Sequence, residues 1–396
     1  MRVLQVVPFI SPEFGGPSVA LPGLARGLTE AGVDTTLLTT DADPSGRLDV
    51  PLDRRVIRDG AEYIFHHVLT IGGRYGVAPT MLRTLRTSVA TYDVVHIHWL
   101  YNFACIAAAR AAIAAAVPFV VQPNGSLDPH QFRKNHVIKR VYLATVGRPL
   151  LRHAAAFVFT SQQERDLAVH RPRCPAWIVP VGLDGASFGK RPPLGAFRAA
   201  FPAVQGPFLL FLGRLDPKKG LDLLILAFAR IARARPELWL VVAGPDAGGY
   251  GLEIRRLAER LGVERRVCFT GMLSHELKLA AYVDAELFVL PSYAENFGAV
   301  ITEALAYGLP VVISNRVNIW REMAEAGGAV VVECSVESVA AGIGAALADP
   351  DFRRRAATRG PALVRDAYTW DAIVPKLVEK YASVAVSPSI GEPHVP

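Results

Sequence analysis

Short apolar runs alternate with longer amphipathic segments along almost the whole chain. In the first half, the runs that predict buried strands are 2–9, 34–40, 92–99, 119–123, 155–161 and 176–182. In the second half they are 208–214, 238–244, 267–271, 286–292, 309–314 and 330–334. The intervening segments, such as 20–32, 105–116 and 220–235, have the composition and spacing of helices. Strands that alternate with helices predict βαβ units and parallel sheets.

One stretch interrupts this alternation. Residues 182–207 are rich in glycine and proline and carry no long period, which is typical of a linker. We therefore predict three parts and a terminal segment: an N-terminal Rossmann-like domain (1–185), a linker (186–206), a C-terminal Rossmann-like domain (207–365), and a helix that packs back on the N-terminal domain with a disordered tail (366–396). Two parallel α/β domains joined by a hinge predict a ligand cleft at the carboxyl ends of their sheets.

Two glutamates, Glu295 and Glu303, are separated by seven residues in the run PSYAENFGAVITEALAYGLPVV. The run predicts a strand over 286–292, a turn, and a helix over 299–308 that a glycine closes. Glu295 then lies on the loop and Glu303 on the helix that the loop feeds. A pair of acids on a solvated helix is the alternative, but the buried strands on both sides favour a site.

The backbone N–H groups of residues 296–300 are expected to be free at the start of that helix. Such a helix N-terminus is a ready anion site. Two carboxylates suit sugar hydroxyls, and a ring of amides suits phosphate. Together they predict a nucleotide-sugar site.

Basic and glycine-rich turns follow the first strand of each predicted domain. In FLGRLDPKKGLDLL, Arg214 can donate forked hydrogen bonds to a pyrophosphate, and Lys219 supplies a point charge near the next helix. A solvated basic loop is the alternative. In the first domain, Gly15 and Gly16 let the backbone approach a ligand closely. Neither turn contains the P-loop or G-x-G-x-x-G pattern.

Metal-binding patterns are weak in this sequence. His96 and His98 alternate along one predicted strand, but no further ligand cluster accompanies them. His98 lines the cleft or packs in the core, and the sequence leaves both open. Asp41 and Asp43 form a DxD, although their turn-rich loop favours a solvated turn. We therefore predict no metal site.

Composition narrows the partners and the compartment. The formal net charge of +7 is spread along the chain, so an anionic substrate or an anionic membrane surface fits better than nucleic acid. Residues 128–156 mix basic with apolar side chains and can lie on anionic lipid or form a solvated helix face. The four cysteines are far apart and the first apolar run is too short for a signal peptide, which indicates a cytoplasmic protein.

Taken together, these motifs resemble the family 4 retaining glycosyltransferases (glycosyl transferases group 1) of the GT-B fold. The matching elements follow the family's order over nearly the whole chain: Gly15-Gly16, VVHIHW (94–99), PNGSLDP (123–129), VPVGLD (179–184), FLGRLDPKKG (211–220), VVAGP (241–245) and ENFGAVITEALAYGLPVV (295–312). NIWRE (318–322) and PNGSLDPH look like the subgroup that builds bacterial exopolysaccharides and other surface glycans. The implied fold class is α/β, with two Rossmann-like parallel α/β/α domains facing across a cleft.

The resemblance implies a retaining, metal-independent hexosyltransferase whose only small-molecule requirement is a UDP- or GDP-linked sugar donor. Arg214 and Lys219 would hold the donor diphosphate, and Glu295 would contact the sugar hydroxyls. The residues that it places around the donor are Gly15, Gly16, Arg214, Lys219, Gly271, Met272, Glu295, Asn296, Phe297, Gly298, Ala299, Val300 and Glu303. Glu303 would grip the ribose, while Gly271 and Met272 would border the base.

The implied acceptor is a glycan or a polyprenyl-linked sugar at the cytoplasmic face of a membrane, without nucleic acid. Many relatives carry a histidine near the reacting sugar, but the corresponding region here reads QPNGS, so an acceptor-side role for Asn124 or His98 stays open. A nucleotide-sugar epimerase or a non-catalytic nucleotide- or glycan-binding protein are the alternatives. A phosphorylase would need a pyridoxal-phosphate lysine motif, which the sequence lacks.

Overall fold

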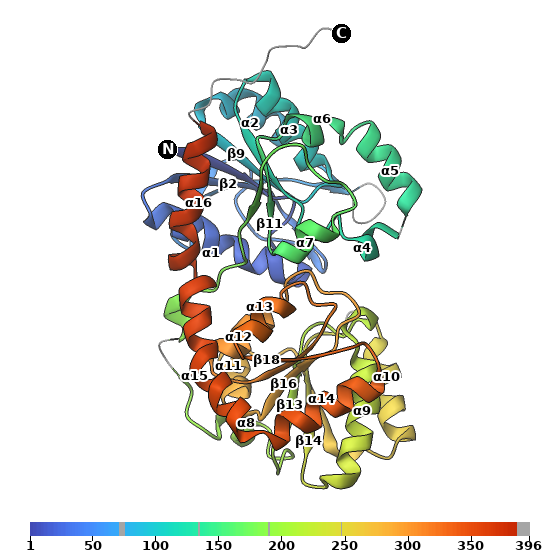
Figure 1. The fold of residues 1–396 in the computed structure, drawn as a ribbon. Coiled ribbons are helices and arrows are strands. Elements are labelled where there is room, and N and C mark those ends of the chain that lie inside the picture. Colours follow the sequence, from blue (N-terminus) through green and yellow to red (C-terminus); the bar gives the residue numbers. More distant parts are fainter. Residues whose placement is uncertain (71–75, 134, 189–190, 247, 386–396) are drawn as a thin grey trace. The chain divides into compact units, whose positions relative to one another are not determined.

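The structure is a computed structural model that describes residues 1–70, 76–133, 135–188, 191–246 and 248–385 (Figure 1). The disordered tail predicted at the end of segment 366–396 lies outside the described residues, which end at Ala385. The chain forms two compact units. Among the described residues, the first unit comprises Met1–Gly182 together with helix α16 (Trp370–Ala385), and the second comprises Leu183–Thr369.

The first unit is built around an eight-stranded sheet. In spatial order its strands are β12 (Ala176–Ile178), β11 (Ala156–Phe159), β10 (Phe119–Gln122), β9 (Val94–His98), β1 (Arg2–Val6), β2 (Asp34–Thr40), β6 (Ala61–His66) and β5 (Arg55–Arg58). All neighbours are parallel except β5 and β6. The chain order reverses between β1 and β9, so ligands are expected where these two strands end.

Helices cover this sheet. They are α1 (Gly16–Glu30), α2 (Pro79–Ser88), α3 (Phe103–Ala114), α4 (Pro129–Arg133), α5 (His136–Ala144), α6 (Arg148–His153), α7 (Gln162–Leu167) and α16 (Trp370–Ala385). Short ribbons pair β3 (Ala42–Asp43) with β4 (Gly46–Arg47), and β7 (Leu69–Thr70) with β8 (Gly76–Val77). In the parts of the chain described above, no helix is both long and apolar enough to cross a bilayer.

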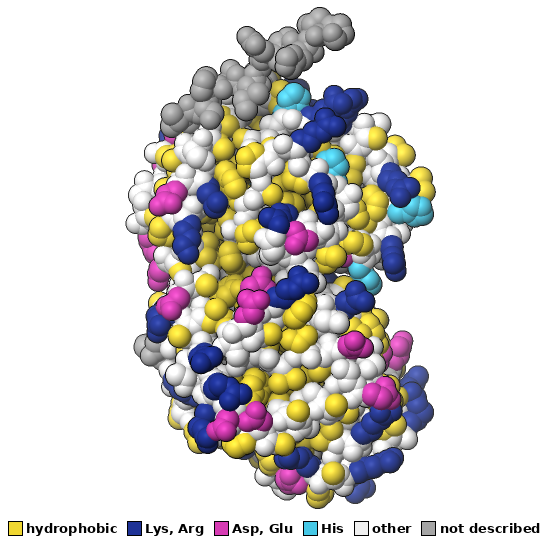
Figure 2. Space-filling model, viewed as in Figure 1, with side chains coloured by type: hydrophobic (Ala, Val, Ile, Leu, Met, Phe, Trp, Pro, Cys, Tyr) yellow, Lys and Arg dark blue, Asp and Glu magenta, His cyan; other side chains and the backbone are white. Residues whose placement is uncertain are grey.

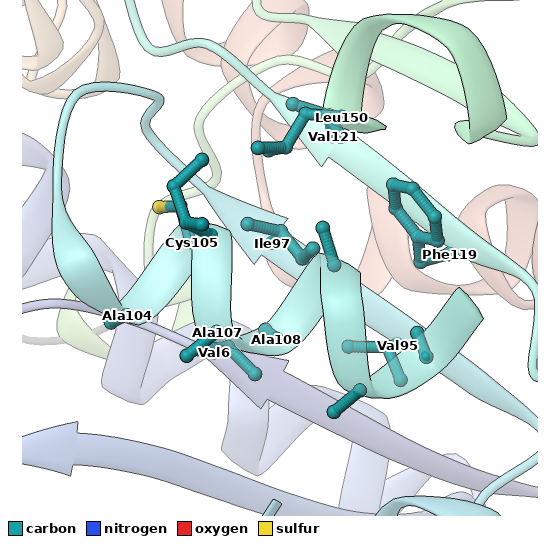
Figure 3. Packing of buried hydrophobic residues seen from close by; sticks show 14 of the residues in the cluster. Val6, Val95, Ile97, Ala104, Cys105, Ala107, Ala108, Phe119, Val121 and Leu150 are labelled. Atoms are coloured by element: carbon teal, nitrogen blue, oxygen red, sulfur yellow. The ribbon is translucent and has the colours of Figure 1, made fainter. Parts of the chain in front are cut away.

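The sheet separates two hydrophobic clusters, because successive side chains of a strand point to opposite faces. Leu4 and Val6 of β1 pack into one cluster, and Val3 packs into the other. Helix α3 covers the first cluster almost entirely with alanine, which allows it to lie close to Val95 and Ile97 of β9 (Figure 3). A strand that is buried on both faces has a continuous run of apolar residues, and for this reason most strands of the sheet could be predicted from the sequence.

Two strands of this sheet were not anticipated. β6 is buried and pairs with β2, and β5 joins it through a hairpin at Asp59 and Gly60, both with positive φ. The apolar run in β6 is only three residues long (Tyr63–Phe65), which is too short to predict a strand from the sequence. β1 also ends at Val6, earlier than predicted, because Pro8 has no backbone N–H to donate.

Four buried side chains join the C-terminal helix α16 to β1 and β9. Gln5 donates from Nε2 to the Tyr381 hydroxyl at 3.0 Å, and this hydroxyl lies 2.6 Å from His96 Nδ1. His98 Nε2 lies 2.7 Å from Gln5 Oε1, so it carries the proton of that bond. Helix α16 also packs along α1, with Trp370 and Val374 against Gly23 and Gly27.

The two histidines make a pH prediction. Burial lowers the pKa of His96 to about 3 and holds the pKa of His98 well below its ordinary value. The unfolded chain binds a proton on each near pH 6.5 and the folded chain does not, so stability should fall as the pH drops from 6.5 toward 3. At pH 5 the loss from His96 is roughly 2 kcal/mol. Denaturant unfolding at several pH values measures this effect. The free energy of unfolding of His96→Gln should depend less on pH than that of the parent, while His153→Gln, at an exposed position, should behave as the parent does. Equal pH dependence for all three proteins would contradict the prediction.

The second unit contains a six-stranded parallel sheet. In spatial order its strands are β15 (Val267–Gly271), β14 (Trp239–Ala243), β13 (Phe208–Leu212), β16 (Leu287–Leu290), β17 (Val311–Ser314) and β18 (Ala329–Val332). Its helices are α8 (Ala196–Ala200), α9 (Leu221–Ala234), α10 (Tyr250–Arg260), α11 (His275–Asp284), α12 (Ala299–Ala306), α13 (Trp320–Glu325), α14 (Val336–Ala348) and α15 (Pro350–Ala367). This strand order is that of a doubly wound dinucleotide-binding sheet.

The segment expected to be a linker contains helix α8 and packs within the second unit. Phe197 is fully buried and stacks on Phe201 at 4.7 Å. The carboxylate of Asp284, at the end of α11, accepts the backbone N–H groups of Gly195 and Phe197 at 2.7 and 3.0 Å. The helix is only five residues long, which explains why no period marked it in the sequence.

Candidate functional site

The chain order in the second sheet reverses between β13 and β16, and the loops that follow these two strands meet there. The loop after β13 spans residues 213–220 and the loop after β16 spans 291–298. Tyr293 donates its backbone N–H to the Lys218 carbonyl at 2.8 Å, which ties the loops together. At Gly220, with φ +68°, a Cβ would lie 2.1 Å from the Pro291 carbonyl oxygen, so only glycine permits this approach.

Lys219 and Glu295 form an ion pair across these loops. The Lys219 ammonium donates to Glu295 Oε2, and each side chain is only 12% exposed. The Glu295 backbone is fixed as well: its N–H donates to the Arg316 carbonyl, and its carbonyl accepts from the Asn318 N–H, at 3.0 and 2.9 Å. The carboxylate therefore has a defined position at the carboxyl edge of the sheet.

The electrostatics keep Glu295 ionised. Burial alone would raise the pKa of this carboxyl, but the charges of Lys219, Lys218 and Arg214, with the Lys219 hydrogen bond, lower it below its ordinary value. Burial lowers the pKa of Lys218, and the neighbouring Glu295 opposes that effect. Lys218 therefore belongs to this cluster, although only Lys219 was predicted from the motif. The two successive lysines in DPKKG were the feature of the sequence that could have indicated it.

Arg214 begins the same loop and is exposed. The Asp216 carboxylate caps the short turn that follows by accepting the Lys218 N–H at 3.0 Å, which orders the loop between the two basic positions. Three cations and two carboxylates, those of Asp216 and Glu295, thus share one sheet edge. An anionic group bound here would meet a net positive field.

Helix α12 starts at the same edge. Gly298 is its N-cap with φ +77°, and a Cβ there would meet Ile301 Cδ1 at 2.9 Å. The Phe297 side chain is buried, so this residue offers backbone to a ligand rather than its ring. The N–H groups of Ala299 and Val300 belong to the first turn of the helix, where no preceding carbonyl is available to them within the helix. Asn296 completes the turn.

Glu303 lies on α12 and is held by α11. Lys278 donates from Nζ to Oε1 at 3.0 Å, and the Tyr282 hydroxyl donates to Oε2 at 2.8 Å. Burial and the Glu303 charge hold the pKa of Tyr282 well above its ordinary value, so Tyr282 remains a donor. Each carboxylate oxygen can accept a second hydrogen bond, as a pair of vicinal hydroxyls would require. Lys278 and Tyr282 are not predictable as partners of Glu303 from the sequence, since no local spacing relates them to it.

Gly271 is the last residue of strand β15, which lies beyond β14 from β13, and Met272 follows it. Gly271 has φ +68° and accepts the Gly244 N–H at 2.8 Å, and Met272 is 68% exposed. An exposed thioether is an adaptable apolar surface. The second unit therefore brings together eleven of the predicted donor-site residues, from Arg214 to Glu303, at one edge of its sheet.

The other predicted residues lie in the first unit. Gly15, with φ +103°, is the N-cap of α1, and a Cβ added at Gly16 would meet nothing within 4 Å. Asn124 has φ +51° after β10; it accepts from Gln122 Nε2 at 3.1 Å, and its own Nδ2 is buried without a hydrogen-bond partner among the described residues. His98 is fully buried, with its ring stacked on His96 at 4.1 Å.

The chain was compared with known proteins. Residues 15–183 match the Glycosyl transferase 4-like domain, and residues 197–362 match Glycosyl transferases group 1. An uncharacterised glycosyltransferase of Methanocaldococcus jannaschii is 33% identical, over 96% of this chain and 98% of its own. The GDP-mannose:cellobiosyl-diphosphopolyprenol alpha-mannosyltransferase of Xanthomonas oryzae is 27% identical, over 99% of each chain. The chain belongs to the family 4 glycosyltransferases.

The fold agrees with this assignment. The structure of Anabaena HepE in complex with UDP and glucose superimposes with a TM-score of 0.77 at 21% identity, over 97% of this chain and 100% of that one. The GT-B fold class and the family that the motifs predicted are thereby confirmed. The protein is a glycosyltransferase, and the roles of its individual residues follow as proposals.

Within the part of the chain that the structure describes, no three His, Cys, Asp or Glu side chains come together as metal ligands. The DxD residues have other partners: Asp41 accepts from the Val68 N–H and lies 2.8 Å from His67 Nδ1, and Asp43 accepts from the Ser45 N–H. Asp41 is buried, which differs from the solvated turn that we expected.

Proposed function

We propose that this glycosyltransferase is a retaining, metal-independent hexosyltransferase that moves a sugar from a UDP- or GDP-linked donor to a glycan or polyprenyl-linked acceptor in cell-surface polysaccharide synthesis. The observation that carries the proposal is the Lys219–Glu295 pair beside Lys218 and Arg214 at the switch point of the second sheet. The cations suit a diphosphate, and an ionised carboxylate beside them suits sugar hydroxyls. The cellobiosyl-diphosphopolyprenol named for the Xanthomonas relative supports a lipid-linked acceptor.

The residues divide between recognition and chemistry. Glu303, steadied by Lys278 and Tyr282, binds the ribose hydroxyls, and Gly271 with Met272 borders the base. Arg214, Lys219 and the first amides of α12 stabilise the charge that builds on the departing diphosphate. The bond from the anomeric carbon to the diphosphate oxygen breaks as the acceptor oxygen attacks the same face. The acceptor proton passes to the leaving phosphate oxygen, so no protein nucleophile is required.

On the acceptor side, we propose that Asn124 Nδ2, which has no hydrogen-bond partner among the described residues, donates to the reacting sugar or acceptor. Glu164, itself buried, fixes the neighbouring loop by accepting the Gly125 N–H, and it also accepts the Thr160 N–H, both at 2.6 Å. His98 is enclosed by core residues, which favours a supporting role for it. We further propose that the protein works in the cytoplasm against an anionic membrane surface.

Nucleotide binding and product stereochemistry test this function. Thermal denaturation with UDP, GDP, ADP or CMP, without added metal, is expected to show a shift of several degrees for one diphosphate nucleotide, since a ligand at about 100 times its Kd stabilises by roughly 2.7 kcal/mol. NMR of the product formed with the matching nucleotide sugar should show the donor's anomeric configuration. Inverted product would overturn the retaining mechanism, and conversion of the donor without any acceptor would indicate an epimerase.

A further inference from the structure

A cavity of about 780 Å³ lies in the first unit, between α2, α3 and α5. Its lining includes Phe103, Ile106, Ala107 and Ala111 of α3 and Ile138 and Tyr142 of α5. The volume is within the range of about 300–1,000 Å³ that small-molecule sites occupy. The donor site described above uses none of these residues.

The cavity opens onto an apolar surface formed by α5. Val137, Ile138 and Val141 are 60%, 70% and 57% exposed, and α5 has no buried residue. Ile138 both lines the cavity and reaches this surface. A helix that turns its aliphatic side chains outward beside an apolar cavity marks a site for an apolar ligand.

The charge around the cavity is strongly positive. Helices α2, α3, α5 and α6 together carry seven lysines and arginines. Helices α2, α3, α5 and α6 contain no acidic residue, and Arg86, Arg110 and Lys139 line the cavity. Figure 2 shows this part of the first unit, at the upper right, with dark blue and cyan side chains around yellow ones. A ligand with an anionic head complements this surface.

The position of the cavity relates it to the sheet edge where ligands bind. Tyr101 and Asn102, at the start of α3, line one end, three residues after β9 finishes at His98, and Ala114 lines the region where α3 ends. The cavity therefore extends along α3 away from the carboxyl edge of the sheet. Lys139 lies at the near end, with its Nζ 5.3 Å from the centre of the Tyr101 ring. The Tyr142 hydroxyl donates to the Leu100 carbonyl at 2.5 Å and so fixes its ring as part of the wall.

We propose that this cavity binds the first isoprene units of a polyprenyl diphosphate acceptor, with Lys139 near the diphosphate. The apolar lining matches the hydrocarbon chain, the positive surroundings match the diphosphate, and the near end starts at the sheet edge where the acceptor sugar would be needed. The inference rests on the proposed function in that it takes the acceptor to be lipid-linked. It assigns the part of the chain that recognises the lipid.

Titration calorimetry with geranylgeranyl diphosphate, below its micelle concentration, tests the proposal. The full chain is expected to bind it saturably and about ten-fold more tightly than inorganic pyrophosphate, which has the head without the chain. Ala111→Phe places a ring in the cavity and narrows it, so it should weaken binding about ten-fold, while Ile113→Phe, on the exposed side of the same helix, should change it by less than about two-fold. Lys139→Gln should weaken binding about five-fold, and the adjacent exposed Arg140→Gln by less than about two-fold.

The outcomes separate this proposal from the function above. Absent or unsaturable binding, or equal affinities for Ala111→Phe and Ile113→Phe, would overturn it. A second result would also overturn it: the parent and Ala111→Phe bind equally well to vesicles of phosphatidylglycerol and phosphatidylcholine, and they also have equal affinities for geranylgeranyl diphosphate. This result would indicate a membrane-binding surface instead of a site for the isoprene chain. The proposed nucleotide site lies in the second unit. The absence of a thermal shift with nucleotides would therefore argue against the donor-site assignment and not against this cavity.

Discussion

Replacing Glu295 with glutamine is expected to reduce sugar transfer roughly 10²–10³-fold, the effect of removing one well-placed polar group from a transition-state site. The structure keeps this carboxyl ionised through Lys219, Lys218 and Arg214. Glutamine preserves the size of the side chain but removes its charge, so the contact with the sugar hydroxyls weakens. Because the variant no longer neutralises Lys219, its affinity for UDP or GDP alone should be unchanged or higher.

This opposite behaviour of turnover and nucleotide affinity identifies the role of Glu295. Steady-state kinetics with the donor that the thermal shift selects, together with calorimetry of the free nucleotide, measures both quantities. Glu325→Gln is the matched control, since Glu325 is exposed in the same unit and outside the site. Near-normal turnover of Glu295→Gln would remove the basis of the donor-site assignment.

Replacing Arg214 with glutamine is expected to weaken binding of the diphosphate nucleotide about 10–100-fold, because a hydrogen bond to a charged group contributes about 1.5–3 kcal/mol. The value of kcat/KM should fall further, by roughly 10²–10³-fold, since charge on the diphosphate grows as the sugar departs. Arg214→Lys keeps the charge but loses the forked geometry, so it should lie between the parent and Arg214→Gln.

Thermal shift with the selected nucleotide and initial rates at several donor concentrations check this result. Arg230→Gln provides the control: Arg230 is 53% exposed on α9 and pairs with Glu337 on the surface. If Arg214→Gln and Arg230→Gln bound the nucleotide equally well, the diphosphate would not be held by Arg214.

Local sequence pattern predicted most of the residues of the proposed donor site. Arg214, Lys219 and Glu295 each lie in a loop that directly follows an apolar strand, and the carboxyl ends of parallel strands share one edge of a sheet, so the placement of these residues at one sheet edge follows from the sequence alone. The glycines were equally readable, because φ values such as +77° at Gly298 are strained for other residues. These inferences need only the identity of neighbouring residues in the chain.

The partners of the site residues could not be predicted from the sequence. Lys278 and Tyr282 of α11 contact Glu303 although they lie 25 and 21 positions away in the chain, and their local spacing does not predict this contact. The cavity beside α3 was equally hidden, since the alanines that line it read only as a well-packed helix. Its discovery required the volume that α2 and α5 leave open beside them.

The sequence by itself therefore determined the α/β class, the family, and the strand-end positions of the basic and acidic residues, because period and composition act over a few neighbouring residues. Only the tertiary structure decided that β6 enters the first sheet beside β2, and that α16 returns across 285 positions to place Tyr381 against His96. It also decided that Lys219 and Glu295, 76 positions apart, form one ion pair. Such contacts depend on which strands lie side by side, and strand order follows from packing of the whole unit.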